Sequence, residues 1–198
     1  FSREELGLPK DVFVFCNFGR TCKIMPEEFN IWMSLLNEIQ NSVIWLLESN
    51  ECAKNNLIAE ATKCGVDSSR LIFAKKMPLD MHLSRQKCAD LFLDTFNQNS
   101  GIMTFLALRF HLPLVTLSGK SMFARISTSV LESLGMNELI TETKDSYKNL
   151  IFELATNPKE YKYIKNKLIK AQKETKYYDP HFFAQTLENE YKKIVNSK

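Results

Sequence analysis

Two positively charged side chains stand in a short polar loop near the start of the chain. Arg20 and Lys23 follow an apolar run that begins at Val12 and is typical of a buried strand, and a Pro-Glu-Glu helix start follows at Pro26. In α/β proteins this arrangement brings a cation to the carboxyl end of a sheet strand, where the crevice for phosphorylated ligands lies. Lys23 is therefore the first candidate for a phosphate contact, and the alternative is a lysine in a solvated surface loop.

A histidine and an arginine three residues apart form a second candidate pair. His82 and Arg85 follow Pro78 in a segment with a helical pattern, so both lie on one face of a helix. An imidazole there can stack on a base while a guanidinium bonds a phosphate or ribose oxygen. The alternatives are a structural histidine and an arginine that pairs with Asp80 or with carbonyl groups.

A third loop, Ser-Gly-Lys-Ser at residues 118–121, looks superficially like a phosphate-binding loop. It lacks the G-x-x-x-x spacing that precedes the lysine of a P-loop, and it follows the fifth predicted strand instead of the first. We therefore expect Lys120 to contribute only weakly to any site.

Alternating strand and helix signals supply the framework for these side chains. Strands of this size separated by helices predict a parallel sheet with right-handed crossovers and helices on both faces, a Rossmann-like α/β fold. After the first strand, the predicted strands cover 42–47, 70–74, 91–94, 113–116 and 138–140. Helices are predicted at 26–38, at 51–63, after Pro78, from a cap at Asn99 or Ser100 to about Phe110, and up to Gly135. We expect the sheet domain to occupy 1–143 and C-terminal helices at 145–157, 158–178 and 180–197 to pack on it.

Composition narrows the class of protein. The 198 residues contain 44% hydrophobic and 11% aromatic residues, enough for one folded domain, and the net charge of +3 is too small to favour nucleic acid. The five cysteines are irregularly spaced, which argues against a zinc site and a disulfide framework and favours a reducing, cytoplasmic setting. No apolar run approaches the roughly 20 residues of a membrane span. The chain starts at Phe1 with what reads as the end of a helix or linker, so we expect a piece of a longer protein.

Many short segments, taken in order, are similar to one family. The chain resembles the C-terminal catalytic half of the O-GlcNAc transferase and SPINDLY family of protein glycosyltransferases, from Phe1 to about Tyr191. The resemblance is carried by Gly7-Leu8-Pro9, Cys16-Asn17-Phe18, Lys23-Ile24, Pro26, Trp32, Asn41-Ser42-Val43, Trp45-Leu46-Leu47, Ile72-Phe73, Pro78, His82, Arg85, Ala89-Asp90, Leu93-Asp94-Thr95, Val115-Thr116, Gly119, Arg125 and Leu134-Gly135.

The resemblance implies the second Rossmann-like domain of a GT-B enzyme, the half that binds the nucleotide sugar. It assigns the diphosphate contact needed for activity to Lys23, places His82 and Arg85 at the nucleotide end, and implies that Leu47 and Met77 line the nucleotide pocket. A fixed ammonium would stabilise the charge that grows on a diphosphate leaving group without a metal ion. The implied donor is a UDP-sugar, with UDP-GlcNAc first, and the implied acceptor is Ser or Thr of a protein. An N-terminal catalytic half and a TPR region would precede this chain.

The chain also departs from the family pattern. Where active members carry Asn-Gly-His-Thr-Thr and an Asp three residues later, this chain has Asn99, Ser100, Gly101, Ile102 and Met103, and then Leu106. Leu79 replaces a lysine and Arg20 replaces a glutamine. Backbone N–H groups at Asn99, Ser100 and Gly101 still form a helix start that favours anions, and Arg20 adds charge on the Lys23 side.

Two other functions remain open. A degenerate, non-catalytic glycosyltransferase domain would act as a scaffold or protein-binding module, and apolar Ile102, Met103 and Leu106 are what such a loss would leave. A nucleotide-sugar enzyme of the same architecture, such as an epimerase, would need carboxylate pairs that the sequence does not display.

Overall fold

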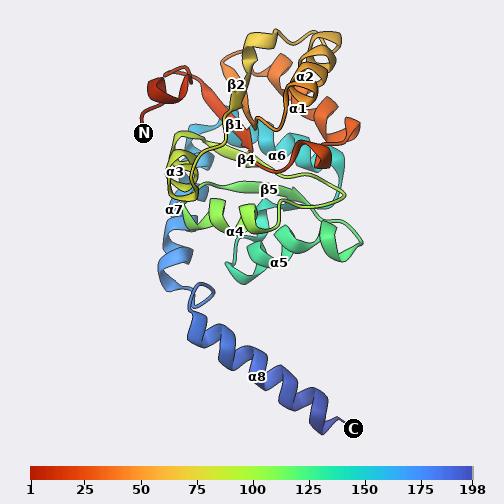
Figure 1. Cartoon of the computed structure of the whole chain (residues 1–198). Helices are drawn as coiled ribbons and strands as arrows, with labels where there is room; N and C mark the ends of the chain where they lie inside the picture. Colours follow the sequence, from red (N-terminus) through yellow and green to blue (C-terminus); the bar gives the residue numbers. More distant parts are fainter. Residues whose placement is uncertain (198) are drawn as a thin grey trace.

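The computed structural model describes residues 1–197 and contains a six-stranded parallel sheet (Figure 1). The strand order is β3-β2-β1-β4-β5-β6. The strands are β1 (Phe13–Asn17), β2 (Ser42–Leu47), β3 (Leu71–Ala74), β4 (Leu91–Leu93), β5 (Leu114–Leu117) and β6 (Ile140–Thr141). The predicted Rossmann-like fold is confirmed, and the strand ends lie within two residues of their expected positions.

The strand order reverses next to β1, and this fixes where a ligand can bind. From β1 the chain moves outward through β2 to β3, then returns to place β4 on the other side of β1 and moves outward again. The loops that leave β1 and β4 therefore diverge to opposite faces of the sheet and open a crevice at their carboxyl ends. Lys23 and the segment around Asn99 belong to these two loops.

Helices cover both faces of the sheet (Figure 1). Helices α1 (Pro26–Glu38) and α6 (Lys144–Thr156) contact each other on one face, and α4 (Ile102–Arg109) and α5 (Ile126–Ser133) contact each other and β5. Helix α2 (Glu51–Lys63) leads from β2 to β3, and the short α3 (Leu79–Arg85) leads from β3 to β4. The remaining turns are 3-10 helices at Glu4–Leu6, Thr21–Lys23, Ser68–Arg70, Gln86–Cys88, Met122–Ala124 and Asn137–Leu139.

The core is rich in large aromatic side chains that also join distant elements. Trp32 of α1 donates a hydrogen bond from its indole to the hydroxyl of Tyr147 in α6, at 3.2 Å. That hydroxyl donates to the carbonyl of Asp94 at the end of β4, at 3.0 Å. All three residues are buried, so α1 and α6 are anchored to the strand end that borders the crevice.

The C-terminal helices differ in how they pack. Helix α6 lies against the sheet, and α7 (Pro158–Glu174) buries Ile164 and Leu168. Helix α8 (Pro180–Asn196) buries no residue and projects away from the body (Figure 1). The expectation that all three helices pack on the sheet domain is therefore corrected for α8. Its exposed apolar side chains are Phe182, Phe183, Leu187, Tyr191, Ile194 and Val195.

Candidate functional site

The loops after β1 and β4 are tied together at the point where the strand order reverses. The side chain of Asn17 donates to the carbonyl of Leu93 at 2.6 Å and accepts from the N–H of Gly19 at 2.8 Å. A Cβ on Gly19 would lie 2.9 Å from the Asn17 Oδ1, so the close approach of this loop to β1 requires glycine. The floor of the crevice is therefore closed and fixed by the strand ends themselves.

Lys23 bridges the crevice. It ends the 3-10 turn Thr21–Lys23, and its Nζ donates to the carbonyl oxygen of Asn99 at 2.9 Å, across 76 positions of sequence. The side chain is half-buried, so the ammonium stays accessible to a ligand while one of its three donors is held. The structure thus places the cation predicted from the sequence beside the segment 99–101, as expected.

The segment that faces Lys23 is shaped by a buried carboxylate. Asp94 is fully buried and accepts hydrogen bonds from the N–H of Thr95 at 3.0 Å, the N–H of Ser100 at 2.8 Å and the hydroxyl of Thr116 at 2.8 Å. Burial raises the pKa of Asp94, while the hydrogen bonds that the carboxylate accepts from the Ser100 N–H and the Thr116 hydroxyl act in the opposite direction. Asp94 therefore joins β4, β5 and the start of α4.

Most polar atoms of Asn99 and Ser100 are bonded within the protein. The N–H of Asn99 donates to the carbonyl of Phe123 at 2.9 Å and the N–H of Ser100 to Asp94 at 2.8 Å, so the expectation that both N–H groups are free for an anion is corrected. The Asn99 amide donates to the carbonyl of Thr95 and accepts from the N–H of Ser127, so its polar atoms are already used within the protein. The hydroxyl of Ser100 is buried and has no hydrogen-bond partner within residues 1–197. Helix α4 begins at Ile102 with Gly101 as its N-cap, so neither residue caps it with its side chain, and that expectation is corrected.

Gly101 has an unusual backbone conformation, with φ 62° and ψ −119°. Residues with a Cβ rarely adopt a positive φ, and the few that do prefer the left-handed helical region with positive ψ. No atom lies within 4 Å of the position that a Cβ would take, so the restriction at this site comes from the backbone alone.

We expect Gly101→Asn to lower the free energy of unfolding by about 1–3 kcal/mol, because asparagine must hold a strained conformation there. Gly7→Asn is the matched control, since Gly7 has φ 71° and ψ 20°, a left-handed conformation that asparagine tolerates, and equally open space. Urea denaturation of both variants measures the difference. Equal losses in the two variants would show that ψ at Gly101 does not matter.

The second candidate pair forms a buried cluster on α3. Arg85 is only 1% exposed, and it donates from Nη1 to the carbonyl of Lys75 and from Nη2 to Nδ1 of His82, both at 2.7 Å. Its guanidinium lies 5.0 Å from the ring centre of Phe18 and 5.6 Å from that of Trp45. His82 is half-buried and packs edge-on against Phe18. Arg85 thus faces the protein, in agreement with the carbonyl-bound alternative, and cannot reach a ligand directly in this conformation.

A cavity of about 710 Å³ lies over the carboxyl end of β2. It brings together Arg20 and Leu47, both predicted as binding residues, and adds Lys76 from the loop after β3. Met77 was also predicted as a binding residue. It follows Lys76 in the chain and is partly buried, but it does not line this cavity. The other lining residues are Thr21, Cys22, Ser49, Asn50, Ala53, Asn56 and Leu57.

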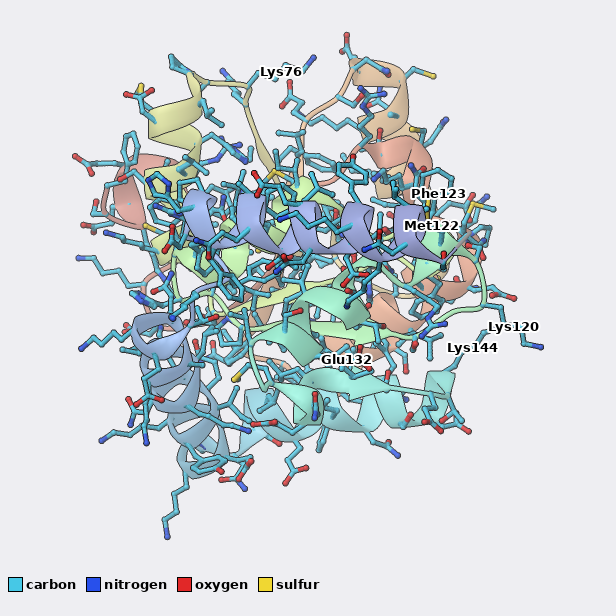
Figure 2. All side chains as sticks on the ribbon, turned by 90° about the horizontal axis from the view of Figure 1, so that it is seen from below. Lys76, Lys120, Met122, Phe123, Glu132 and Lys144 are labelled. Atoms are coloured by element: carbon cyan, nitrogen blue, oxygen red, sulfur yellow. The ribbon has the colours of Figure 1, made fainter. Side chains whose placement is uncertain are left out.

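The Ser-Gly-Lys-Ser loop borders a separate and smaller cavity of about 370 Å³. Figure 2 shows Lys120 and Lys144 at the same edge of the molecule as Met122 and Phe123. Lys144 is held by Glu27 at 2.8 Å, and the backbone of Gly119 is bonded to the carbonyl of Ala124. The backbone N–H groups of Ser118 and Gly119 are thus used within the protein, and the weak role of Lys120 stays a prediction.

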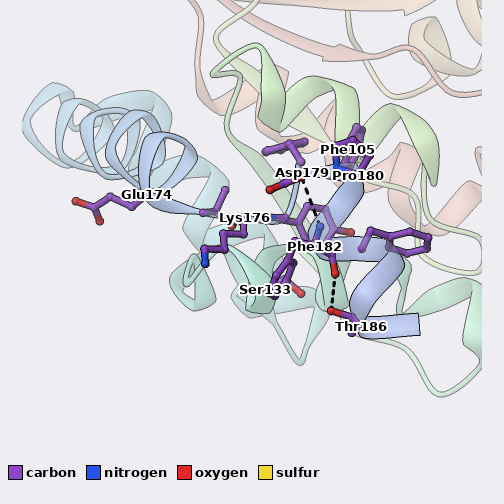
Figure 3. Close-up of a pocket in the computed structure, with 12 residues that line it drawn as sticks. Phe105, Ser133, Glu174, Lys176, Asp179, Pro180, Phe182 and Thr186 are labelled. Atoms are coloured by element: carbon purple, nitrogen blue, oxygen red, sulfur yellow. Dashed lines mark hydrogen bonds between the residues drawn. The ribbon is translucent and has the colours of Figure 1, made fainter. Parts of the chain in front are cut away.

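An apolar cavity of about 840 Å³ lies away from the crevice, where α4 and α5 meet the start of α8 (Figure 3). Phe105, Tyr177, Tyr178 and Phe182 supply aromatic walls. Asp179 caps the start of α8 and accepts from the N–H of His181 at 2.9 Å and from that of Phe182 at 3.4 Å. Tyr177 and Tyr178 pack against Phe105 and against each other at this bend.

Two kinds of site are absent from the part of the chain that the structure describes. No group of three or more His, Cys, Asp or Glu side chains is arranged to hold a metal ion. Within residues 1–197, no helix is both long and apolar enough to cross a bilayer.

A doubly wound parallel sheet, with a lysine across the crevice where its strand order reverses, defines a Rossmann-like α/β domain. The chain belongs to glycosyl transferase family 41, whose model matches residues 1–187. The resemblance read from the sequence is thereby confirmed.

Named relatives agree with this assignment. A UDP-N-acetylglucosamine–peptide N-acetylglucosaminyltransferase of Caenorhabditis elegans is 31% identical over 79% of this chain and 14% of its own length. A probable enzyme of the same name, SEC of Arabidopsis thaliana, is 27% identical over 98% of this chain and 20% of its own. A solved mutant O-GlcNAc transferase of Thermobaculum terrenum aligns with a TM-score of 0.87 and 24% identity, covering 92% of this chain and 36% of that one. This chain therefore spans a minor part of the proteins that it matches.

Proposed function

We propose that this chain is the donor-binding half of a protein O-glycosyltransferase that transfers GlcNAc, or a related sugar, from a UDP-sugar to Ser or Thr. The observation that carries the proposal is the bridge from the Lys23 ammonium to the Asn99 carbonyl, beside the start of α4. A diphosphate in this crevice would meet a fixed cation and the positive end of a helix. The relatives in this family are named for transfer from UDP-N-acetylglucosamine to peptides, which supports UDP-GlcNAc as donor.

In this proposal Lys23 stabilises the negative charge that develops on the UDP leaving group, so that no metal ion is required. Arg20 and Leu47 line the cavity next to it. In the proposal Met77 and His82 lie at the nucleotide end, and Arg85 acts there through its hydrogen bond to His82. The acceptor is a protein or peptide. An N-terminal catalytic half and a TPR region of the same chain would supply the acceptor side in the cytoplasm, so this part alone should not transfer sugar.

Calorimetry with UDP and with UDP-GlcNAc tests the proposal. We expect dissociation constants from the micromolar to the low millimolar range, with CDP or ADP binding more weakly. Failure to bind any nucleoside diphosphate would refute donor binding by this chain.

The second candidate is a degenerate domain that serves as a scaffold. This candidate is favoured by apolar side chains at positions where the family pattern is polar. Leu79 is 65% exposed and Ile102 is 73% exposed, so neither side chain is held in the core. Exposed apolar side chains at the rim of a crevice are suited to a protein contact. The same calorimetric experiment separates the two candidates, because a scaffold has no need to bind UDP.

A further inference from the structure

The contacts of Arg85 determine the chemical form of its neighbour His82. A guanidinium can only donate hydrogen bonds, so the Nδ1 of His82, 2.7 Å from Nη2, must be the acceptor. A neutral imidazole that accepts at Nδ1 carries its proton on Nε2. The structure therefore selects one of the two neutral tautomers.

Arg85 is itself held in place from several directions. Nη1 donates to the Lys75 carbonyl, and the guanidinium plane lies near the rings of Phe18 and Trp45. Phe18 packs edge-on against both Trp45 and His82, with ring centres 5.0 and 5.2 Å apart. A cation enclosed in this way has little freedom to turn away from the imidazole.

The surroundings of His82 oppose a charged ring. Burial and the positive charge of Arg85 together lower the pKa of His82 from 6.5 to about 4. Within residues 1–197, no carboxylate forms an ion pair with His82 to offset this effect. The ring is therefore neutral at physiological pH.

We propose that Arg85 is a positioning residue, which fixes His82 in the Nε2–H tautomer so that the neutral imidazole offers a nucleotide one defined N–H donor. The ligand atom that fits such a donor is an uncharged acceptor, such as a carbonyl oxygen of the base. A diphosphate would instead favour a cation, and Lys23 provides one. The part of this inference that concerns the ligand rests on the proposed function, whereas the tautomer does not.

Nuclear magnetic resonance of protein labelled with ¹⁵N-histidine tests the inference directly. The chain has three histidines, and loss of a signal in His82→Gln assigns His82. We expect the unaltered protein to show the Nε2–H tautomer from pH 7.5 down to about pH 5, with no titration in that interval. A proton on Nδ1, or titration near pH 6.5, would overturn the proposal without any variant.

Arg85→Met removes the donor and the charge while keeping an unbranched apolar side chain. We expect His82 then to titrate nearer its ordinary range and to show both tautomers, and UDP affinity to fall about tenfold from the loss of one oriented hydrogen bond. Arg70→Met is the matched control, because Arg70 is also partly buried and donates to the carbonyls of Ser42 and Ile39. Its His82 signals should not move.

A pH dependence of folding provides a second measurement. Because the pKa of His82 is about 4 in the folded protein and 6.5 is its ordinary value, the unfolded chain takes up a proton first as the pH falls. This group therefore lowers the free energy of unfolding progressively between pH 6.5 and about 4, and the decrease should be smaller in Arg85→Met.

The outcomes separate the two proposals. Unchanged His82 signals in folded Arg85→Met would refute the positioning role. A fixed tautomer in a protein that binds no UDP would instead refute the proposed function and leave the role of Arg85 in place.

Discussion

The Lys23→Ala variant should bind UDP about 10- to 100-fold more weakly than the unaltered chain. Lys23 is the cation that crosses the crevice, and a hydrogen bond between charged partners contributes about 1.5–3 kcal/mol. Gly101, Ile102 and Met103, which follow the segment that Lys23 contacts, carry no polar side chain that could compensate. Isothermal titration with UDP at fixed ionic strength gives the ratio of dissociation constants.

A change in net charge alone must be separated from this effect. Lys170→Ala removes the same charge from an exposed position on α7, where the only partner within ion-pair distance among residues 1–197 is Glu174 at 3.9 Å. We expect this control to change UDP affinity less than twofold. Equal weakening in both variants would assign the effect to the overall field of the protein and not to Lys23.

Asp94→Ala should lower the free energy of unfolding by about 3–4 kcal/mol. The substitution leaves the N–H groups of Thr95 and Ser100 and the hydroxyl of Thr116 without their buried acceptor, and each such loss costs about 1–3 kcal/mol. It should also free the segment that faces Lys23, and UDP affinity should fall with it. Chemical denaturation and calorimetry measure the two consequences.

Asp94→Asn distinguishes hydrogen bonding from charge. Oδ1 accepts from both backbone N–H groups and Oδ2 only from Thr116, whose hydroxyl can reverse and accept from an amide. We therefore expect Asn to retain most of the stability, with a loss of about 1 kcal/mol or less. An equal loss in the Asn and Ala variants would mean that the negative charge itself is essential. Asp145→Ala, at an exposed position in α6, controls for removal of a carboxylate.

The fold was predictable because its signals are local and repeated. Apolar runs of strand length alternate with segments of helical period, and Pro26, Pro158 and Pro180 mark helix starts that the structure confirms. The position of Lys23 followed from the same pattern, since a loop after the first strand of such a sheet must lie at its carboxyl end. Helix ends depend on longer-range packing. There α7 ends at Glu174, four residues before its expected end at 178, and α4 has a different cap.

The site was predictable only where position alone determines the role. Sequence spacing placed His82 and Arg85 together, but only the three-dimensional structure shows that Phe18 and Trp45 enclose the arginine. Asp94 was missed as an organising residue, although a carboxylate directly after a fully apolar strand was a usable signal. The projection of α8, in contrast, had no signal in the sequence, because its amphipathic pattern is the same whether or not the apolar side is covered.

The conformation of Gly101 limits how this sequence can change. A histidine placed there, as in the family pattern, would have to adopt φ 62° and ψ −119° or force the start of α4 to rebuild. We therefore expect a histidine at this position to be tolerated only together with substitutions that first reshape the loop. The effect of each substitution here should thus depend on which others are already present.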